Sequence, residues 1–145
     1  MADILVVYYT KSGNTGKMAE LVAEGARKQG THQVRVVLAQ DLDLADFLKA
    51  DGYAIGTPDY FSYPAGQVKT LFDEALAHKS ELQNRPYVGF ISHGGGGRAL
   101  EPLESLSKSI GLTKVTDGLA CKNAPEGDDA EACRQLGAAL AKSLS

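Results

Sequence analysis

The chain has 145 residues, of which 43% are hydrophobic and 23% charged, and its formal net charge is −3. These values are typical of a globular protein and exclude a disordered chain, a coiled coil and a collagen-like repeat. The net acidic charge and the absence of a basic cluster argue against nucleic-acid binding. Two cysteines are too few for a disulfide framework, and their spacing matches no zinc pattern, with only three histidines available as further ligands.

The first half of the chain predicts three strands separated by helices. Residues 4–9 form a continuous apolar run, which predicts a strand buried on both faces. From Asn14 onward the apolar residues recur at helical spacing. Residues 33–38 alternate between apolar and polar, as expected for a strand with one solvated face. A short helix over residues 43–48 then leads to a third strand over residues 53–56.

The second half continues the same alternation. Apolar residues at helical spacing predict a helix over residues 68–76, and residues 87–92 form a fourth strand. A helix over residues 103–110 follows. Residues 112–119 alternate between apolar and polar and predict a fifth strand, and residues 133–144 carry the apolar stripe of a last helix.

This alternation of strands and helices predicts a parallel sheet with helices on both faces. The first, third and fourth strands are solidly apolar, whereas the second and fifth alternate. Central strands need two buried faces and edge strands do not, so the strand order 2-1-3-4-5 fits best. We therefore predict one α/β domain over residues 1–145, a three-layer, doubly wound, five-stranded parallel sheet.

The apolar runs of the chain also indicate where in the cell the protein acts. The longest apolar run, residues 4–9, is too short to cross a bilayer, and Asp3 stands directly before it where a signal peptide would carry basic residues. We therefore expect a cytoplasmic protein with no membrane segment. Nothing in the predicted edge strands favours self-association, so a monomer is expected.

In sheets of this kind, ligands bind beyond the carboxyl ends of the strands, where the strand order reverses. Here that point lies between the first and third strands. The loops that reach it span residues 10–15, 57–64 and 93–98. The binding site is therefore expected among these three loops.

The first of these loops has the composition of an anion site. Gly13 permits a tight turn, so that successive backbone N–H groups can point inward at a helix start. Thr10, Ser12, Thr15 and Asn14 add neutral hydroxyl and amide donors, which suit a terminal phosphate bound without a metal. The glycine spacing matches neither a P-loop nor the dinucleotide fingerprint. The alternative is ordinary helix capping, which favours the same residue types.

At this point the chain resembles a known family. Thr-Lys-Ser-Gly-Asn-Thr at residues 10–15 is similar to the FMN-phosphate loop of the flavodoxin family. Residues 56–61 and 65–69 resemble the flavodoxin-like NAD(P)H:quinone oxidoreductases, which share the same core. Ser-His-Gly-Gly at residues 92–95 occupies the family's second flavin-contacting loop. The resemblance covers essentially the whole chain and implies a flavodoxin-like FMN-binding domain.

The resemblance implies a role for each loop, with no catalytic acid or base and no metal ligand. The residues expected to hold the FMN phosphate are Thr10, Ser12, Gly13, Asn14 and Thr15. Those expected to wrap the isoalloxazine ring, with one aromatic stacked on it, are Thr57, Pro58, Asp59, Tyr60, Phe61 and Tyr63. Those expected to meet the pyrimidine edge, through backbone N–H groups, are Ser92, His93, Gly94, Gly95 and Gly96. Aromatic cover and close backbone approach are what a flat ring needs, although three aromatics can equally form a small core beneath a loop.

Other residues keep two interpretations. Lys11 is expected to be a solvated side chain, and His93 is either bonded to backbone at a strand end or placed at the flavin. Arg98 either opens the next helix or neutralises the reduced ring or a partner. Cys133 lies on an apolar helical stripe and is expected to be buried, whereas Cys121 is expected near the site edge, where it could be exposed.

One feature departs from the family pattern. Many electron-carrying members place a glycine in the first ring loop, where a peptide flips to accept a bond from the reduced flavin, but none stands between Gly56 and Gly66. A flip at a residue such as Ser62 would require a positive φ, which is costly for a residue with a side chain.

The function expected from the resemblance is FMN-dependent electron transfer, with low-potential electrons shuttled between redox partner proteins. The alternative is an NAD(P)H-dependent quinone or metal reductase that uses bound FMN. The glycine-only loop after His93 leaves one ring face less covered, which favours the alternative, whereas the family members with that activity are longer. A phosphoryl-accepting receiver domain is excluded because Tyr9, Thr10, Gly56 and Thr57 stand where it needs carboxylates.

Overall fold

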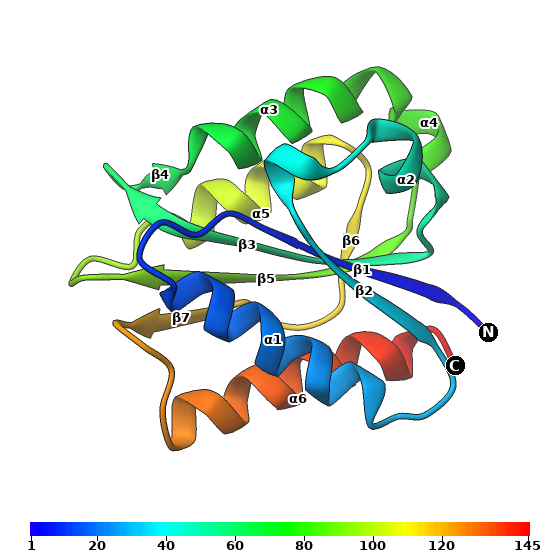
Figure 1. The fold of residues 1–145 in the computed structure, drawn as a ribbon. Helices are drawn as coiled ribbons and strands as arrows, with labels where there is room; N and C mark the ends of the chain where they lie inside the picture. The colour runs from blue at the N-terminus through cyan, green and yellow to red at the C-terminus, as the bar shows by residue number, and fades with distance from the viewer.

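The computed structural model describes residues 1–145 as one sheet with helices on both faces (Figure 1). The strands are β1 (Asp3–Tyr8), β2 (Gln33–Leu38), β3 (Gly52–Tyr60), β4 (Tyr63–Pro64), β5 (Pro86–His93), β6 (Thr113–Lys114) and β7 (Leu119–Lys122). The helices are α1 (Asn14–Arg27), α2 (Leu44–Lys49), α3 (Gly66–Ala75), α4 (Lys79–Leu82), α5 (Leu100–Ser109) and α6 (Asp128–Ser143), with 3-10 turns at Ala39–Asp41 and Leu76–His78. None of these helices combines the length and the apolar character that a bilayer crossing requires.

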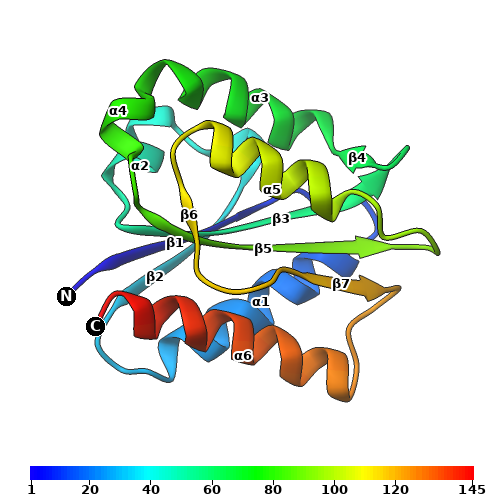
Figure 2. The same ribbon diagram turned by 180° about the vertical axis from the view of Figure 1, so that it is seen from behind.

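The sheet confirms the predicted topology. Its order is β2-β1-β3-β5-β6, all parallel, with β7 also paired to β5. The solidly apolar strands β1, β3 and β5 are central and the alternating ones lie at the edges, as two buried faces and one buried face require. Helices α1 and α6 cover one face, and α2, α3, α4 and α5 cover the other (Figures 1 and 2).

The prediction of one continuous fifth strand over residues 112–119 is wrong. The chain forms two short strands, β6 and β7, which pair with opposite ends of β5. Val115 still donates its N–H to the Tyr87 carbonyl, but residues 116–118 leave the sheet before Leu119 rejoins it opposite Phe90. An alternating pattern reports only which side chains are buried, so it does not reveal that an edge strand is interrupted.

The predicted loop over residues 57–64 is instead largely a β-hairpin. Strand β3 continues past Pro58 to Tyr60, and the chain turns back so that Tyr63 in β4 pairs with Tyr60. The two turn residues, Phe61 and Ser62, both have positive φ (56° and 65°), as the tight type I′ hairpin turn requires. The aromatic residues are therefore carried on a rigid ribbon.

Two apolar cores lie on either side of the sheet. One is packed against α2, α3, α4 and α5 and contains Phe47 and Phe72, and the other lies beneath α1 and α6 and contains Met18. Helices α1 and α6 touch backbone to backbone, because a Cβ on Gly25 would lie 1.8 Å from the Arg134 carbonyl oxygen and one on Gly137 would lie equally close to that of Val22. This contact fixes the position of α1, and with it the loop that precedes the helix.

Candidate cofactor site

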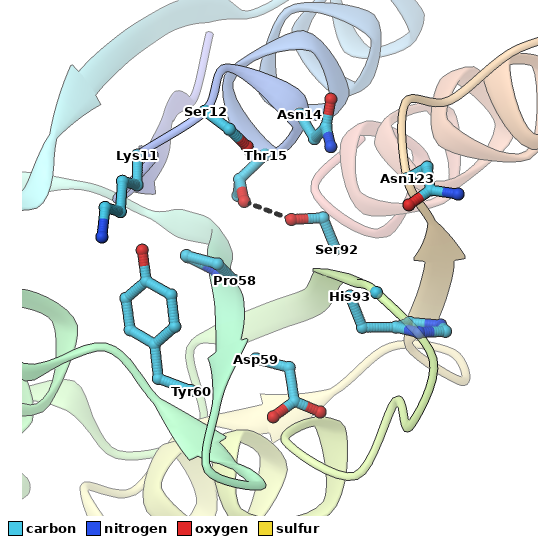
Figure 3. A pocket seen from close by; sticks show the side chains of 11 residues that line it. Lys11, Ser12, Asn14, Thr15, Pro58, Asp59, Tyr60, Ser92, His93 and Asn123 are labelled. Carbon is cyan, nitrogen blue, oxygen red and sulfur yellow. Dashed lines mark hydrogen bonds between the residues drawn. The ribbon is translucent and has the colours of Figure 1, made fainter.

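A cavity of about 250 Å³ opens beyond the carboxyl ends of β1, β3 and β5, at the edge predicted from the strand order (Figure 3). The lining residues are Lys11, Ser12, Asn14, Thr15, Pro58, Asp59, Tyr60, Ser92, His93, Gly94 and Asn123. They come from all three predicted loops and from the segment after β7. Parallel pairing brings these distant stretches of sequence to one place.

The loop before α1 presents free donors to this cavity. Gly13 has a φ of 99° and no side chain to cap helix α1, which begins at Asn14 with no acidic residue in its first turn. The Thr10 hydroxyl accepts hydrogen bonds from the N–H groups of Gly13 (3.1 Å) and Gly16 (3.2 Å) and so fixes the loop from beneath. The N–H groups of Asn14 and Thr15 donate to no protein acceptor. Two free N–H groups at the positive dipole end of a helix suit an anionic group.

The base of the cavity is held by a buried pair of hydroxyls. Thr15 Oγ1 and Ser92 Oγ lie 2.6 Å apart and join the start of α1 to the end of β5 (Figure 3). Both residues are buried. Each of these hydroxyls therefore already has one protein partner, and the pair fixes the distance between the first and third loops.

The three aromatics of the hairpin do not share one position. Tyr60 lines the cavity and packs edge-on against Tyr9, with ring centroids 6.4 Å apart. Phe61 at the turn is fully exposed and Tyr63 is 40% exposed, and neither lines the cavity. Burial, with a smaller contribution from Tyr9, raises the pKa of the Tyr60 phenol above its ordinary value. Of the three, Tyr60 is therefore the aromatic in position to contact a ligand.

Thr57 supports the hairpin rather than lining the cavity. It is fully buried, and its hydroxyl accepts the Ala65 N–H (2.9 Å) and donates to the Pro58 carbonyl (2.9 Å). These bonds tie the end of β3 to the start of α3. Pro58, next in the chain, does line the cavity.

The third loop contributes less side-chain surface than the other two. His93 and Gly94 line the cavity, whereas Gly95 and Gly96 lie outside its lining. His93 Nδ1 and Tyr60 Oη are both buried without a hydrogen-bond partner. Both atoms are inaccessible to solvent, so the polar groups that are open to a ligand here are the free N–H groups at the start of α1.

Two lining residues were not among the predicted site residues. Lys11 reaches the cavity although it is exposed, and Asn123 approaches from the end of β7, where its N–H donates to the His93 carbonyl (2.8 Å). Asn123 has a φ of 61° and directly follows the strand paired with the end of β5. The sequence signal that could have identified Asn123 is an asparagine just beyond an edge strand. Because the fifth strand was predicted over residues 112–119, Asn123 was expected to lie outside the sheet edge.

The cysteines lie away from the cavity. Cys133 is buried as predicted, and Cys121, for which the sequence left exposure open, is also fully buried. Burial, to which Asp129 adds, raises the pKa of the Cys121 thiol, and burial together with the adjacent Cys121 raises that of Cys133 to about 12. Both thiols therefore stay protonated at neutral pH, which removes the basis for a reactive cysteine here.

Comparison with known proteins places the chain among flavodoxins. The flavodoxin family model matches residues 6–137. A flavodoxin from Aquifex aeolicus is 34% identical over 98% of this chain and 86% of its own length. The coenzyme F420H(2) oxidase of Methanothermobacter marburgensis is 30% identical over 97% of this chain, which corresponds to only 36% of that longer protein.

Solved structures agree with the sequence matches. A flavodoxin from the domain Archaea superposes with a TM-score of 0.91 at 25% identity, and the match covers 98% of each chain. The two folds therefore correspond over nearly their full lengths.

The hairpin turn provides a test of backbone strain. Ser62 is exposed, and we expect Ser62→Gly to raise the free energy of unfolding of the flavin-free protein by about 1 kcal/mol, because a left-handed conformation costs an ordinary residue roughly 1–2 kcal/mol. Urea denaturation measures the change. Ser105→Gly, at an exposed position inside α5, is the matched control and should lower stability. Equal effects of the two substitutions would contradict strain at Ser62.

The buried thiols predict a dependence of stability on pH. An unfolded thiol ionises near pH 9, whereas folded Cys133 retains its proton to about pH 12. The stabilisation from the protonated thiol is complete below pH 9 and is lost as the pH rises toward 12, by up to about 1.4 kcal/mol per pH unit. In urea denaturation, the stability difference between the wild type and Cys133→Ala should therefore narrow from pH 8 to pH 10.5. A constant difference would show that the folded thiol ionises normally.

Proposed function

This chain belongs to the flavodoxin family, and from that premise we propose that it carries low-potential electrons between a donor and an acceptor protein. Flavodoxins bind FMN and transfer electrons to redox partners, so the chain is an FMN-binding electron-transfer protein. The observation that carries the proposed site is the start of α1, where the N–H groups of Asn14 and Thr15 are free beside a cavity that Tyr60 also lines.

We propose that the FMN phosphate lies at the start of α1. Ser12, Asn14 and Thr15 line the cavity there with neutral donors, and the N–H groups of Asn14 and Thr15 are free. Neutral donors together with a helix dipole can hold a phosphate without a metal ion. Lys11 also reaches the cavity, and its charge favours the same anion.

We propose that the ring lies between the hairpin and the glycine loop. Tyr60 supplies an aromatic face, and His93 and Gly94 supply polar edges. When bound, FMN supplies the electron-transfer chemistry. Tyr60, His93 and Gly94 would orient the ring and cover part of it from water.

Two observations favour a carrier over a reductase. The Aquifex aeolicus flavodoxin is 34% identical in a match that covers 86% of that protein, whereas the match to the oxidase is 30% identical and covers only 36% of that protein. Exposed Phe61 and Tyr63, on the hairpin that borders the cavity, offer a surface that a protein partner can cover. We propose that the protein acts as a monomer. Its partners are a protein that donates electrons to it and a protein that accepts electrons from it.

The phosphate site is tested by adding a negative charge. Asn14→Asp should raise the Kd for FMN at least tenfold, about 1.4 kcal/mol, because the carboxylate repels the phosphate, and should leave riboflavin binding within twofold. The same substitution should stabilise the flavin-free protein by about 0.3–1 kcal/mol, because a negative charge favours a helix start. Quenching of flavin fluorescence measures both affinities.

Asn84→Asp is the matched control for this charge change. Asn84 precedes β5 at the opposite end of the sheet and should alter neither affinity. If the wild type binds FMN and riboflavin equally, the loop before α1 is only a helix cap, and the proposed site is wrong.

Carrier and reductase are separated by their electron sources. We expect dithionite-reduced holoprotein to transfer its electrons to cytochrome c, and we expect no sustained oxidation of NADH or NADPH in the presence of a quinone. Stopped-flow and steady-state absorbance measure the two reactions. Steady turnover of NAD(P)H with a quinone at enzyme-like rates would support the reductase instead.

A further inference from the structure

The Asp59 carboxylate joins the two loops that flank the proposed ring site. One oxygen, Oδ1, accepts the N–H of Ser62 in the hairpin turn at 2.8 Å. The other, Oδ2, accepts the N–H groups of Arg98 at 2.9 Å and Ala99 at 3.3 Å, just before α5. Figure 3 shows the carboxylate directed away from Thr15 and Ser92. Its lone pairs are therefore committed to protein backbone from two different loops.

The glycine loop needs such an attachment. Residues 94–97 carry no side chains, and a Cβ placed on Gly94 or Gly95 would contact nothing within 4 Å. The loop is held at its start, where the His93 carbonyl accepts the Asn123 N–H. At its end, the Arg98 and Ala99 N–H groups have Asp59 as their acceptor. Four consecutive glycines would otherwise sample many conformations.

The hairpin turn is strained, whereas the glycine loop is flexible. Phe61 and Ser62 hold left-handed conformations that ordinary residues avoid, and the Ser62 N–H is fixed by Asp59. A carboxylate that accepts several backbone N–H groups, two of them at a helix start, is a strong, charge-assisted acceptor. One ionised side chain thereby stabilises a strained turn and a flexible loop together.

We propose that Asp59 is a positioning residue, not an FMN ligand: its carboxylate holds the hairpin and the glycine loop at the separation that the flavin ring requires. This inference rests on the proposed site for FMN. Asp59 lies at the ring end of the cavity and makes no contact with the phosphate loop. Its effect should therefore fall on binding of the ring and leave binding of the phosphate unchanged.

The test compares Asp59→Asn and Asp59→Ala with the wild type, using riboflavin as a ring-only probe and inorganic phosphate as a phosphate-only probe. An asparagine amide keeps one acceptor oxygen, so it can serve only one of the two loops. We expect the Kd values for FMN and riboflavin to rise about tenfold by the same factor, and the Kd for phosphate to stay within twofold. The visible circular dichroism of bound FMN should change in both variants.

Asp117→Asn removes the same charge from a side chain that is 99% exposed and should change none of these values. Ring affinity within twofold of wild type in both Asp59 variants would overturn the proposal, as would an equal loss of phosphate affinity, which indicates general destabilisation.

A second measurement needs no substitution and no flavin. In the flavin-free wild type, the Ser62, Arg98 and Ala99 amides should exchange with solvent at least tenfold more slowly than those of Gly94 and Gly95. Equal rates would overturn the proposal even if the Asp59 variants fail to fold. If these amides are protected but the wild type binds no FMN, the proposed cofactor site fails while the joining of the two loops stands.

Discussion

The site depends on the parallel pairing of β1, β3 and β5. Because these strands run in the same direction, their carboxyl ends meet at one edge, with Tyr8 opposite Gly56 and Pro58 opposite Ser92. Loops separated by dozens of residues thereby converge on one cavity, as expected where the strand order reverses. The backbone contact of α1 with α6 then holds the first loop in place, so this end of the cavity depends on helix packing on the far side of the same helix.

Much of the polar chemistry at this edge serves the protein itself. The Thr10 and Thr57 hydroxyls hold the backbone of the first two loops, and Thr15 pairs with Ser92. The N–H groups at the start of α1 are left free beside the cavity. In a preorganised site, the polar groups that hold the loops in place are separate from the polar groups left free for a ligand, and the same separation is present here.

The hairpin and the glycine loop over residues 94–97 are held in shape in different ways. The hairpin is a hydrogen-bonded ribbon that accepts positive φ at Phe61 and Ser62. The cost expected for a flip at Ser62 is therefore present in the resting fold, in which both turn residues are already left-handed. The glycine loop carries no such strain and depends on contacts at its two ends. The Asp59 carboxylate accepts hydrogen bonds from both the hairpin turn and the end of the glycine loop.

The sequence by itself determined the class of fold, the strand order and the edge of the sheet at which the cavity lies. Apolar runs and alternation distinguish buried from edge strands, and the Thr10–Thr15 motif with its glycine indicates an anion site, because these are local properties of the chain. Only the tertiary structure decided the rest. The structure shows which hairpin aromatic faces the cavity, that Asn123 lines it, that Cys121 is buried and that Asp59 joins two loops. All of these are relations between residues distant in sequence. Such relations depend on strand register and on which hydrogen bonds form across loops, and no periodicity along the chain records either one.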